Sequence, residues 1–267
     1  DRETTSDGRT FRFRHALVRD AAYAMLIDDD MRLAHELAGD WLARQEGAEP
    51  LAIAEHLVRA EQPERARMWY RRAAEQALAS GDLRAAVERA EQALECGALG
   101  AERAELRLLQ AEARSWTGSL DDAERWAIEA AEGSPLESST WFAAVRKVIY
   151  CTGVRGDLES ALAWLERAEQ VKASPGAPWG FTYCLCEALY AIHIAGDSGR
   201  ANPILDRLVA QVSEGHAPPA VLGEVHRAHA NDAIVSARFD HAAAFARQAA
   251  HDLELAARAR VQLDELG

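Results

Sequence analysis

The chain has 267 residues, of which 49% are hydrophobic, so it can bury a continuous core. Its formal net charge is −13, and such an acidic surface repels phosphate backbones, so we expect no nucleic-acid partner. The sequence contains no apolar run long enough to span a bilayer, and we expect no membrane partner. Its four cysteines show no CxxC spacing, which favours free thiols in a reducing cytoplasm.

The N-terminal region predicts a short strand followed by short helices. Because the chain opens on Asp1 and not on methionine, we interpret it as a piece of a longer protein. Phe11 and Phe13 alternate as in a strand, and helical spacing of apolar residues begins at His15. The aspartates at 28–30 are expected to supply the N-cap of a second helix, and Pro50 is expected to start a third.

A short turn signal then recurs five times, at steps of 37, 38, 40 and 41 residues. Its copies are Gly81-Asp82-Leu83, Gly118-Ser119-Leu120, Gly156-Asp157-Leu158, Gly196-Asp197-Ser198 and Ala237-Arg238-Phe239. Mostly small residues follow five and twelve positions after each start, at Ala86, Ala123, Ala161, Ala201 and Ala242, and at Ala93, Ala130, Ala168, Leu208 and Ala249. A fixed period of this size is typical of stacked helix pairs.

The pattern predicts an all-α body. We expect first helices at 64–80, 101–117, 137–155, 179–195 and 219–236, and second helices at 82–95, 119–132, 157–171, 197–212 and 239–264. Alanine at the crossing points lets two helices approach to about 8–10 Å. The turn glycine is expected to end each first helix, and the Asp or Ser after it to cap the second.

The Gly-Asp turn and the two alanine positions resemble the tetratricopeptide repeat (TPR), although the repeats run longer than the usual length of about 34 residues. Ile149 and Leu189 also stand where a small residue is usual. The resemblance implies a right-handed superhelical solenoid of TPR-like antiparallel helix pairs, whose first helices line a concave groove. We assign about five such pairs to residues 61–267.

A second resemblance concerns residues 1–60. The stretch Phe11-Arg-Phe-Arg-His-Ala-Leu-Val-Arg-Asp-Ala-Ala-Tyr23, with Leu33-Ala-His35 and Ala52-Ile-Ala-Glu-His56, resembles the segment that joins an ATPase module to TPRs in large bacterial regulators. These regulators are serine/threonine kinases, adenylate cyclases and transcription activators of the signal-transducing ATPase class. The resemblance implies that residues 1–60 hold the end of a winged-helix-like domain and linking helices.

The TPR resemblance also implies a site. Counted back from each turn, it places on the concave groove Arg71, Glu75, Glu112, Trp116, Arg146, Tyr150, Tyr183, Tyr190, His193, Arg227 and Asn231. Aromatic residues and arginine are typical of binding hot spots. The expected function is a non-catalytic protein- or peptide-binding scaffold, or sensor arm, of a larger regulatory ATPase or kinase.

Two alternatives stay open. A small-molecule (inducer) sensor would be favoured by a closed apolar pocket near Tyr183, Tyr190 and His193, whereas an open groove of mixed charge would favour a peptide. His226, His229 and Asp232 have the helical spacing of a zinc site, but an ordinary polar helix face is the favoured interpretation. Phosphate-loop, kinase and hydrolase motifs are absent from the sequence, so we expect no enzyme and no cofactor.

Overall fold

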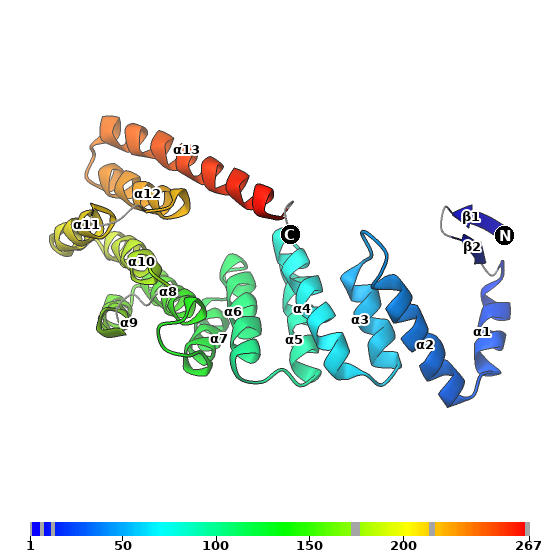
Figure 1. The fold of residues 1–267 in the computed structure, drawn as a ribbon. Coiled ribbons are helices and arrows are strands. Elements are labelled where there is room, and N and C mark those ends of the chain that lie inside the picture. Colours follow the sequence, from blue (N-terminus) through cyan, green and yellow to red (C-terminus); the bar gives the residue numbers. More distant parts are fainter. Residues whose placement is uncertain (1, 6–7, 12–13, 172–176, 214–216, 265–267) are drawn as a thin grey trace.

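The computed structural model describes residues 2–5, 8–11, 14–171, 177–213 and 217–264. Within these ranges the chain forms one two-stranded hairpin and 13 helices, and the helices follow one another in chain order along a curved row (Figure 1). The predicted all-helical solenoid is therefore confirmed for the body of the chain. Of the helices described, none is both long enough and apolar enough to cross a bilayer.

The N-terminal hairpin joins β1 (Arg2–Thr5) to β2 (Gly8–Phe11), with Arg2 opposite Phe11. The strand predicted at Phe11 is thus the second strand of a hairpin, and Phe13 lies outside the described residues. Three helices follow: α1 (Ala16–Ala24), α2 (Asp28–Leu42) and α3 (Pro50–Arg59).

The predicted aspartate cap of α2 is wrong. Its N-cap is Ile27, and the three aspartates from Asp28 to Asp30 form the first helical turn. Negative side chains in that turn stabilise the helix through its dipole and do not accept the capping hydrogen bond.

The body consists of five helix pairs. The first helices are α4 (Pro63–Ala79), α6 (Gly100–Trp116), α8 (Ser139–Val154), α10 (Gly180–Ala195) and α12 (Pro219–Val235). The second helices are α5 (Leu83–Glu95), α7 (Leu120–Gly133), α9 (Leu158–Val171), α11 (Ser198–Ser213) and α13 (Phe239–Asp264). Every boundary agrees with the sequence prediction to within two residues. Each first helix contacts its own pair partner and also the first helix of the next pair.

The five predicted turns share one backbone conformation. The φ angles are 81°, 78°, 82° and 70° at Gly81, Gly118, Gly156 and Gly196, and 56° at Ala237. After two of these turns an aspartate caps the second helix: Asp82 accepts a hydrogen bond from the backbone N–H of Ala85 at 3.0 Å, and Asp157 accepts one from Ser160 at 3.1 Å. The repeated signal therefore encodes the reversal between the two helices of each pair.

Ala237 is the exception that offers a test, because a left-handed φ costs an L-residue about 1–2 kcal/mol. Replacement by glycine removes that cost but adds freedom to the unfolded chain, so we expect Ala237→Gly to raise the free energy of unfolding by about 0.5–1 kcal/mol. Ala210→Gly, on an exposed position of α11, should instead lower it by about 1 kcal/mol. Urea denaturation of both variants measures the two changes in the free energy of unfolding. A loss of stability in Ala237→Gly would contradict the turn geometry.

The small residues after each turn form the core of the solenoid. All ten positions are buried, with at most 6% of any residue exposed. Two first helices approach closely at Gly153 of α8, where a Cβ would lie 2.4 Å from the Cβ of Ala191 on α10. Glycine is required there because α8 and α10 pack backbone against backbone.

A histidine pair joins the N-terminal helices. The Nδ1 atoms of His35 on α2 and His56 on α3 lie 2.8 Å apart, so one ring donates its proton to the other. Burial lowers the pKa of both imidazoles from 6.5, and for His35 the neighbouring His56 and Arg59 lower it further. Both rings are therefore harder to protonate in the folded chain than in the unfolded chain.

This pair predicts that the N-terminal end weakens in acid. The folded pKa values of both histidines lie below 6.5. The stability that the neutral histidine pair gives to the folded chain is therefore fully present above pH 6.5 and is lost as the pH falls below it. We expect amides of α2 and α3 to lose protection from hydrogen exchange between pH 7.5 and 5.5, after correction for intrinsic rates. His35→Gln should remove this change, and His241→Gln, at an exposed position of α13, should not. Equal pH dependence in both variants would contradict the assignment.

Candidate functional site: a groove along the first helices

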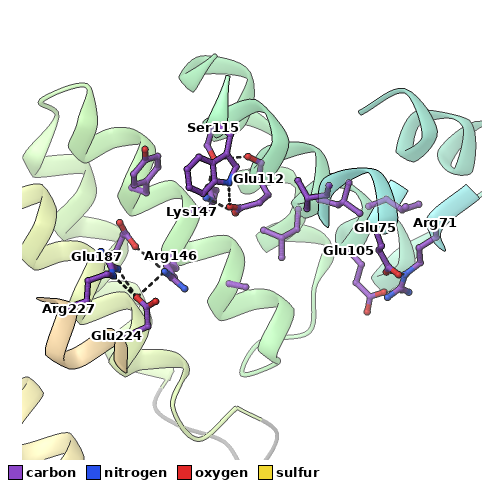
Figure 2. A pocket seen from close by; sticks show the side chains of 17 residues that line it. Arg71, Glu75, Glu105, Glu112, Ser115, Arg146, Lys147, Glu187, Glu224 and Arg227 are labelled. Carbon is purple, nitrogen blue, oxygen red and sulfur yellow. Dashed lines mark hydrogen bonds and ion pairs between the residues drawn. The ribbon is translucent and has the colours of Figure 1, made fainter. Parts of the chain in front are cut away.

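A groove with a cavity volume of about 680 Å³ crosses all five first helices (Figure 2). Its wall includes residues of α4, α6, α8, α10 and α12, and we call it the central groove. The wall is formed by Arg71, Glu75, Leu78, Glu105, Leu106, Leu108, Leu109, Glu112, Ser115, Trp116, Ala143, Arg146, Lys147, Tyr150, Glu187, Glu224 and Arg227. The first helices of successive pairs contact one another, so residues from all five of them line the same groove.

At the α4 end of the groove, one arginine serves two carboxylates. The Nε of Arg71 donates to Glu75 at 2.9 Å, and its Nη1 pairs with Glu105 on α6. All three side chains keep between a third and a half of their surface in solvent. The two carboxylates and one guanidinium therefore leave a net charge of −1 at this end, and a ligand can reach it.

The middle of the groove links α6 to α8. The ammonium of Lys147 lies 2.6 Å from the carboxylate of Glu112 and 3.1 Å from the Oγ of Ser115. The same carboxylate accepts a hydrogen bond of 2.8 Å from the indole N–H of Trp116, which holds a ring that is 72% exposed. The indole is thus fixed at one end and free along its faces, which is a suitable arrangement for a contact surface.

At the far end, Arg146 joins α8 to α10 and α12. Its Nε donates to Glu187 at 3.1 Å, and its Nη2 lies 3.5 Å from Glu224, which also pairs with Arg227 at 2.6 Å. Burial opposes the charge on Arg146, but the two carboxylates outweigh it and raise the pKa of the guanidinium. Figure 2 shows this cluster and the Arg71 cluster at opposite ends of the groove, with Lys147 between them.

Two tyrosines stack beside the middle cluster. The rings of Tyr150 and Tyr190 are nearly parallel, with centroids 6.3 Å apart, and the ammonium of Lys147 lies 5.0 Å from the centroid of the Tyr150 ring. Tyr150 lines the groove, and Tyr190 supports it from α10. Both rings are half-buried, so neither is closed inside the helix layers.

The structure places seven of the eleven predicted residues on the groove wall: Arg71, Glu75, Glu112, Trp116, Arg146, Tyr150 and Arg227. The other four do not line this groove. Tyr190 lies behind Tyr150, while Tyr183 faces a separate pocket. His193 is buried against Asp232 of α12, with its Nε2 3.2 Å from the carboxylate, and Asn231 is half-buried outside the wall.

The pocket beside Tyr183, which we call the side pocket, has a cavity volume of about 340 Å³. Apolar rings and backbone dominate its wall, which is formed by Ser139, Phe142, Ala143, Arg146, Ala177, Pro178, Trp179, Gly180, Tyr183, Pro218 and Val221. Gly180 lies directly against the Phe142 ring, since a Cβ there would come within 2.3 Å of its Cγ. The guanidinium carbon of Arg146 lies 5.4 Å from the centroid of the Tyr183 ring.

The three candidate zinc ligands on α12 do not converge. The Nδ1 of His226 faces Asp252 of α13 at 2.8 Å, and the His229 ring stacks on Phe245 with centroids 5.1 Å apart. Asp232 faces the opposite way, toward His193 and Arg238. In the part of the chain that the structure describes, no three potential ligands gather around one point.

Sequence reasoning missed four charged groove residues: Glu105, Lys147, Glu187 and Glu224. A signal for two of them was present, because ionic partners recur at roughly one repeat. Arg71 and Glu105 are 34 residues apart, and Arg146 and Glu187 are 41 apart. Opposite charges one period apart on first helices therefore predict pairs across neighbouring repeats.

Comparisons with known proteins show the fold alone. No protein-family model matches the sequence, and no curated protein matches it. The solved structure of BtubC (BKLC) from P. vanneervenii aligns with a TM-score of 0.50 and 16% identity, over 86% of this chain and 92% of that one. A Rap protein complexed with competence and sporulation factor aligns with a TM-score of 0.49 and 14% identity, over 90% of this chain and 79% of that one. The first of these alignments shows a similarity of fold and nothing beyond it.

Proposed function

We propose that the chain is a non-catalytic scaffold that binds a protein segment in the central groove. The observation that carries this proposal is the groove itself, which runs over five successive first helices and is lined by charged, aromatic and aliphatic side chains. An elongated wall of this kind suits an extended peptide. The indole of Trp116 and the ring of Tyr150 supply rigid contact area at little cost in entropy.

A small-molecule sensor is the second candidate, and one observation favours it. The side pocket is apolar, and its volume of about 340 Å³ is at the lower end of the range for ligand sites. However, it shares part of its wall with the central groove. Tyr190 and His193, which were expected beside Tyr183, do not contribute to it. A peptide that fills both hollows therefore accounts for more of the surface.

We further propose that the chain is the cytoplasmic TPR arm of a larger bacterial regulator of the kinase or signal-transducing ATPase type. The support for this context is the resemblance of the stretch from Phe11 to Tyr23 and of the His35 and His56 segments. Catalysis would then reside in other modules. Phosphate release from Mg·ATP by the purified chain, abolished by one substitution in residues 1–267, would contradict the non-catalytic assignment.

Selection from a random dodecapeptide library displayed on phage tests the binding proposal. The bait is the full chain, and the comparison bait carries Trp116→Ala and Tyr150→Ala. We expect some peptides to be enriched on the unchanged chain and to compete with one another for binding. These peptides should not be enriched on the comparison bait. If no peptide is enriched, or if enriched peptides bind both baits equally, the groove is not a peptide site.

A further inference from the structure

The central groove and the side pocket adjoin each other at α8. Ala143 and Arg146, both on α8, belong to the walls of both hollows. Ala143 is exposed and has only a methyl group as its side chain. The Arg146 side chain is fixed by Glu187 and Glu224 on one side and lies against the Tyr183 ring on the other. A segment that occupies the groove at Arg146 is therefore adjacent to the opening of the pocket.

The two hollows differ in chemistry. The side pocket presents Phe142, Trp179, Tyr183 and Val221, and Arg146 is its only charged wall residue among the described part of the chain. A polar group would lose hydration there and find few partners besides Ser139 and Arg146, whereas an apolar side chain would gain from burial. The pocket thus suits one large aliphatic or aromatic side chain.

The charges of the central groove favour a ligand with positive charge. Five carboxylates face four cations, and the carboxylates are Glu75, Glu105, Glu112, Glu187 and Glu224. Each cation is already paired: Arg71 and Arg146 contact two carboxylates each, and Lys147 and Arg227 contact one each. An anionic ligand would have to displace these internal partners. A cationic side chain finds the surplus carboxylate at the α4 end, where Glu75 and Glu105 share Arg71.

The distance between the two subsites sets a spacing. From α4 through α6 to α8 there are two helix-to-helix steps of about 8–10 Å each. An extended chain covers about 3.3 Å per residue, so about five or six residues span the gap. We propose that the site binds an extended protein segment with a large apolar side chain in the side pocket and a lysine or arginine, about five or six residues away, between Glu75 and Glu105. This inference rests on the proposed peptide-binding function.

The same phage selection tests the inference through the sequences it returns. We expect enriched dodecapeptides with net positive charge, one large apolar residue and a lysine or arginine at that spacing. Peptides that bind the groove without this pattern, or that are acidic, overturn the inference but leave the proposed function standing. Failure to enrich any groove-dependent peptide removes both.

A synthetic peptide with the selected consensus then separates the two subsites. Changing its apolar residue to alanine should weaken binding at least about tenfold. Ala143→Trp fills the opening of the pocket. It should weaken binding of the parent peptide by a similar factor, but it should not change the affinity for the alanine peptide. Ala210→Trp, on an exposed position of α11, is the matched control and should have no effect. Equal affinity of the parent and alanine peptides would overturn the pocket assignment whether or not the Ala143 variant folds.

The charge subsite has its own comparison. Glu105→Gln removes one carboxylate from the groove, and Glu88→Gln removes one from an exposed site on α5, with the same change in net charge. We expect Glu105→Gln to weaken the peptide and to reduce the salt dependence of binding, and Glu88→Gln to do neither. Equal effects from the two variants would show that the preference for cations comes from the overall charge and not from this subsite.

Discussion

Ala161→Leu should lower the free energy of unfolding by about 1–3 kcal/mol. Ala161 has no exposed surface and lies in the main core cluster, at the crossing of α9 with its neighbours. A leucine there adds three carbon atoms where helices are in contact, so either side chains leave their rotamers or the helices separate. Ala86→Leu, at the equivalent position of the first repeat and equally buried, should have the same effect.

Ala163→Leu is the control, because Ala163 is exposed and lies only two positions along the same helix. Its change in stability should stay within about 0.5 kcal/mol. Thermal and urea denaturation of the three variants provide the measurement. If Ala161→Leu and Ala163→Leu unfold at the same midpoint, the close crossing does not exist, and the repeat register fails with it.

The local structure was largely predictable because the same short sequence signals recur in each repeat. A residue in the left-handed region and an alanine five positions later determine where one helix ends and how closely the next packs. The predicted cap forms at Asp82 and Asp157, whereas Ser119 makes no capping hydrogen bond. The misses have local causes too. The β1–β2 hairpin has no apolar alternation beyond Phe11, and the aspartates at 28–30 are charged enough for either a cap or a first turn.

The groove wall was predictable on α4, α6 and α8 and at Arg227 of α12, but not on α10. Counting from the turns assumes that every first helix presents the same face, and this holds from Arg71 to Tyr150. Between α8 and α10 the assumption fails, because Gly153 lets the helices meet backbone to backbone at Ala191. The α10 residues expected on the wall move behind it or toward the side pocket. This change in packing depends on the contact between Gly153 and Ala191, which lie in different repeats. The sequence of one repeat alone therefore does not predict it.

The buried partners of the charged residues were the least predictable part. His193 was expected in the groove, yet it pairs with Asp232, which in turn binds Arg238. Each of these side chains is compatible with a surface or a core position when taken alone. Only the approach of α10 to α12 brings them together, and burial then requires the pairing. The same holds for Arg146, whose charge is compensated by Glu187 and Glu224 only because α8, α10 and α12 come together.

Tyr150→Ala should weaken a groove-selected peptide by at least about tenfold, because rigid aromatic anchors carry a large share of binding energy. The ring lines the groove, is half-buried and is fixed by Tyr190 on one side and Lys147 on another. Tyr190→Ala should cost less, since Tyr190 acts through the stacked ring and lies outside the wall. Tyr150→Phe, which keeps the ring and loses only the hydroxyl, should bind nearly as well as the parent chain.

Titration calorimetry gives the affinities, and thermal denaturation separates binding from folding. A contact role for Tyr150 requires that Tyr150→Ala lose affinity while the variant is fully folded at the temperature of the titration. The competing explanation is that the stacked tyrosines only support the packing of α8 on α10. In that case Tyr150→Ala and Tyr190→Ala would lower the melting temperature together, and each, below its own melting point, would bind the peptide as tightly as the parent chain. The order of the three affinities therefore decides between a binding ring and a packing ring.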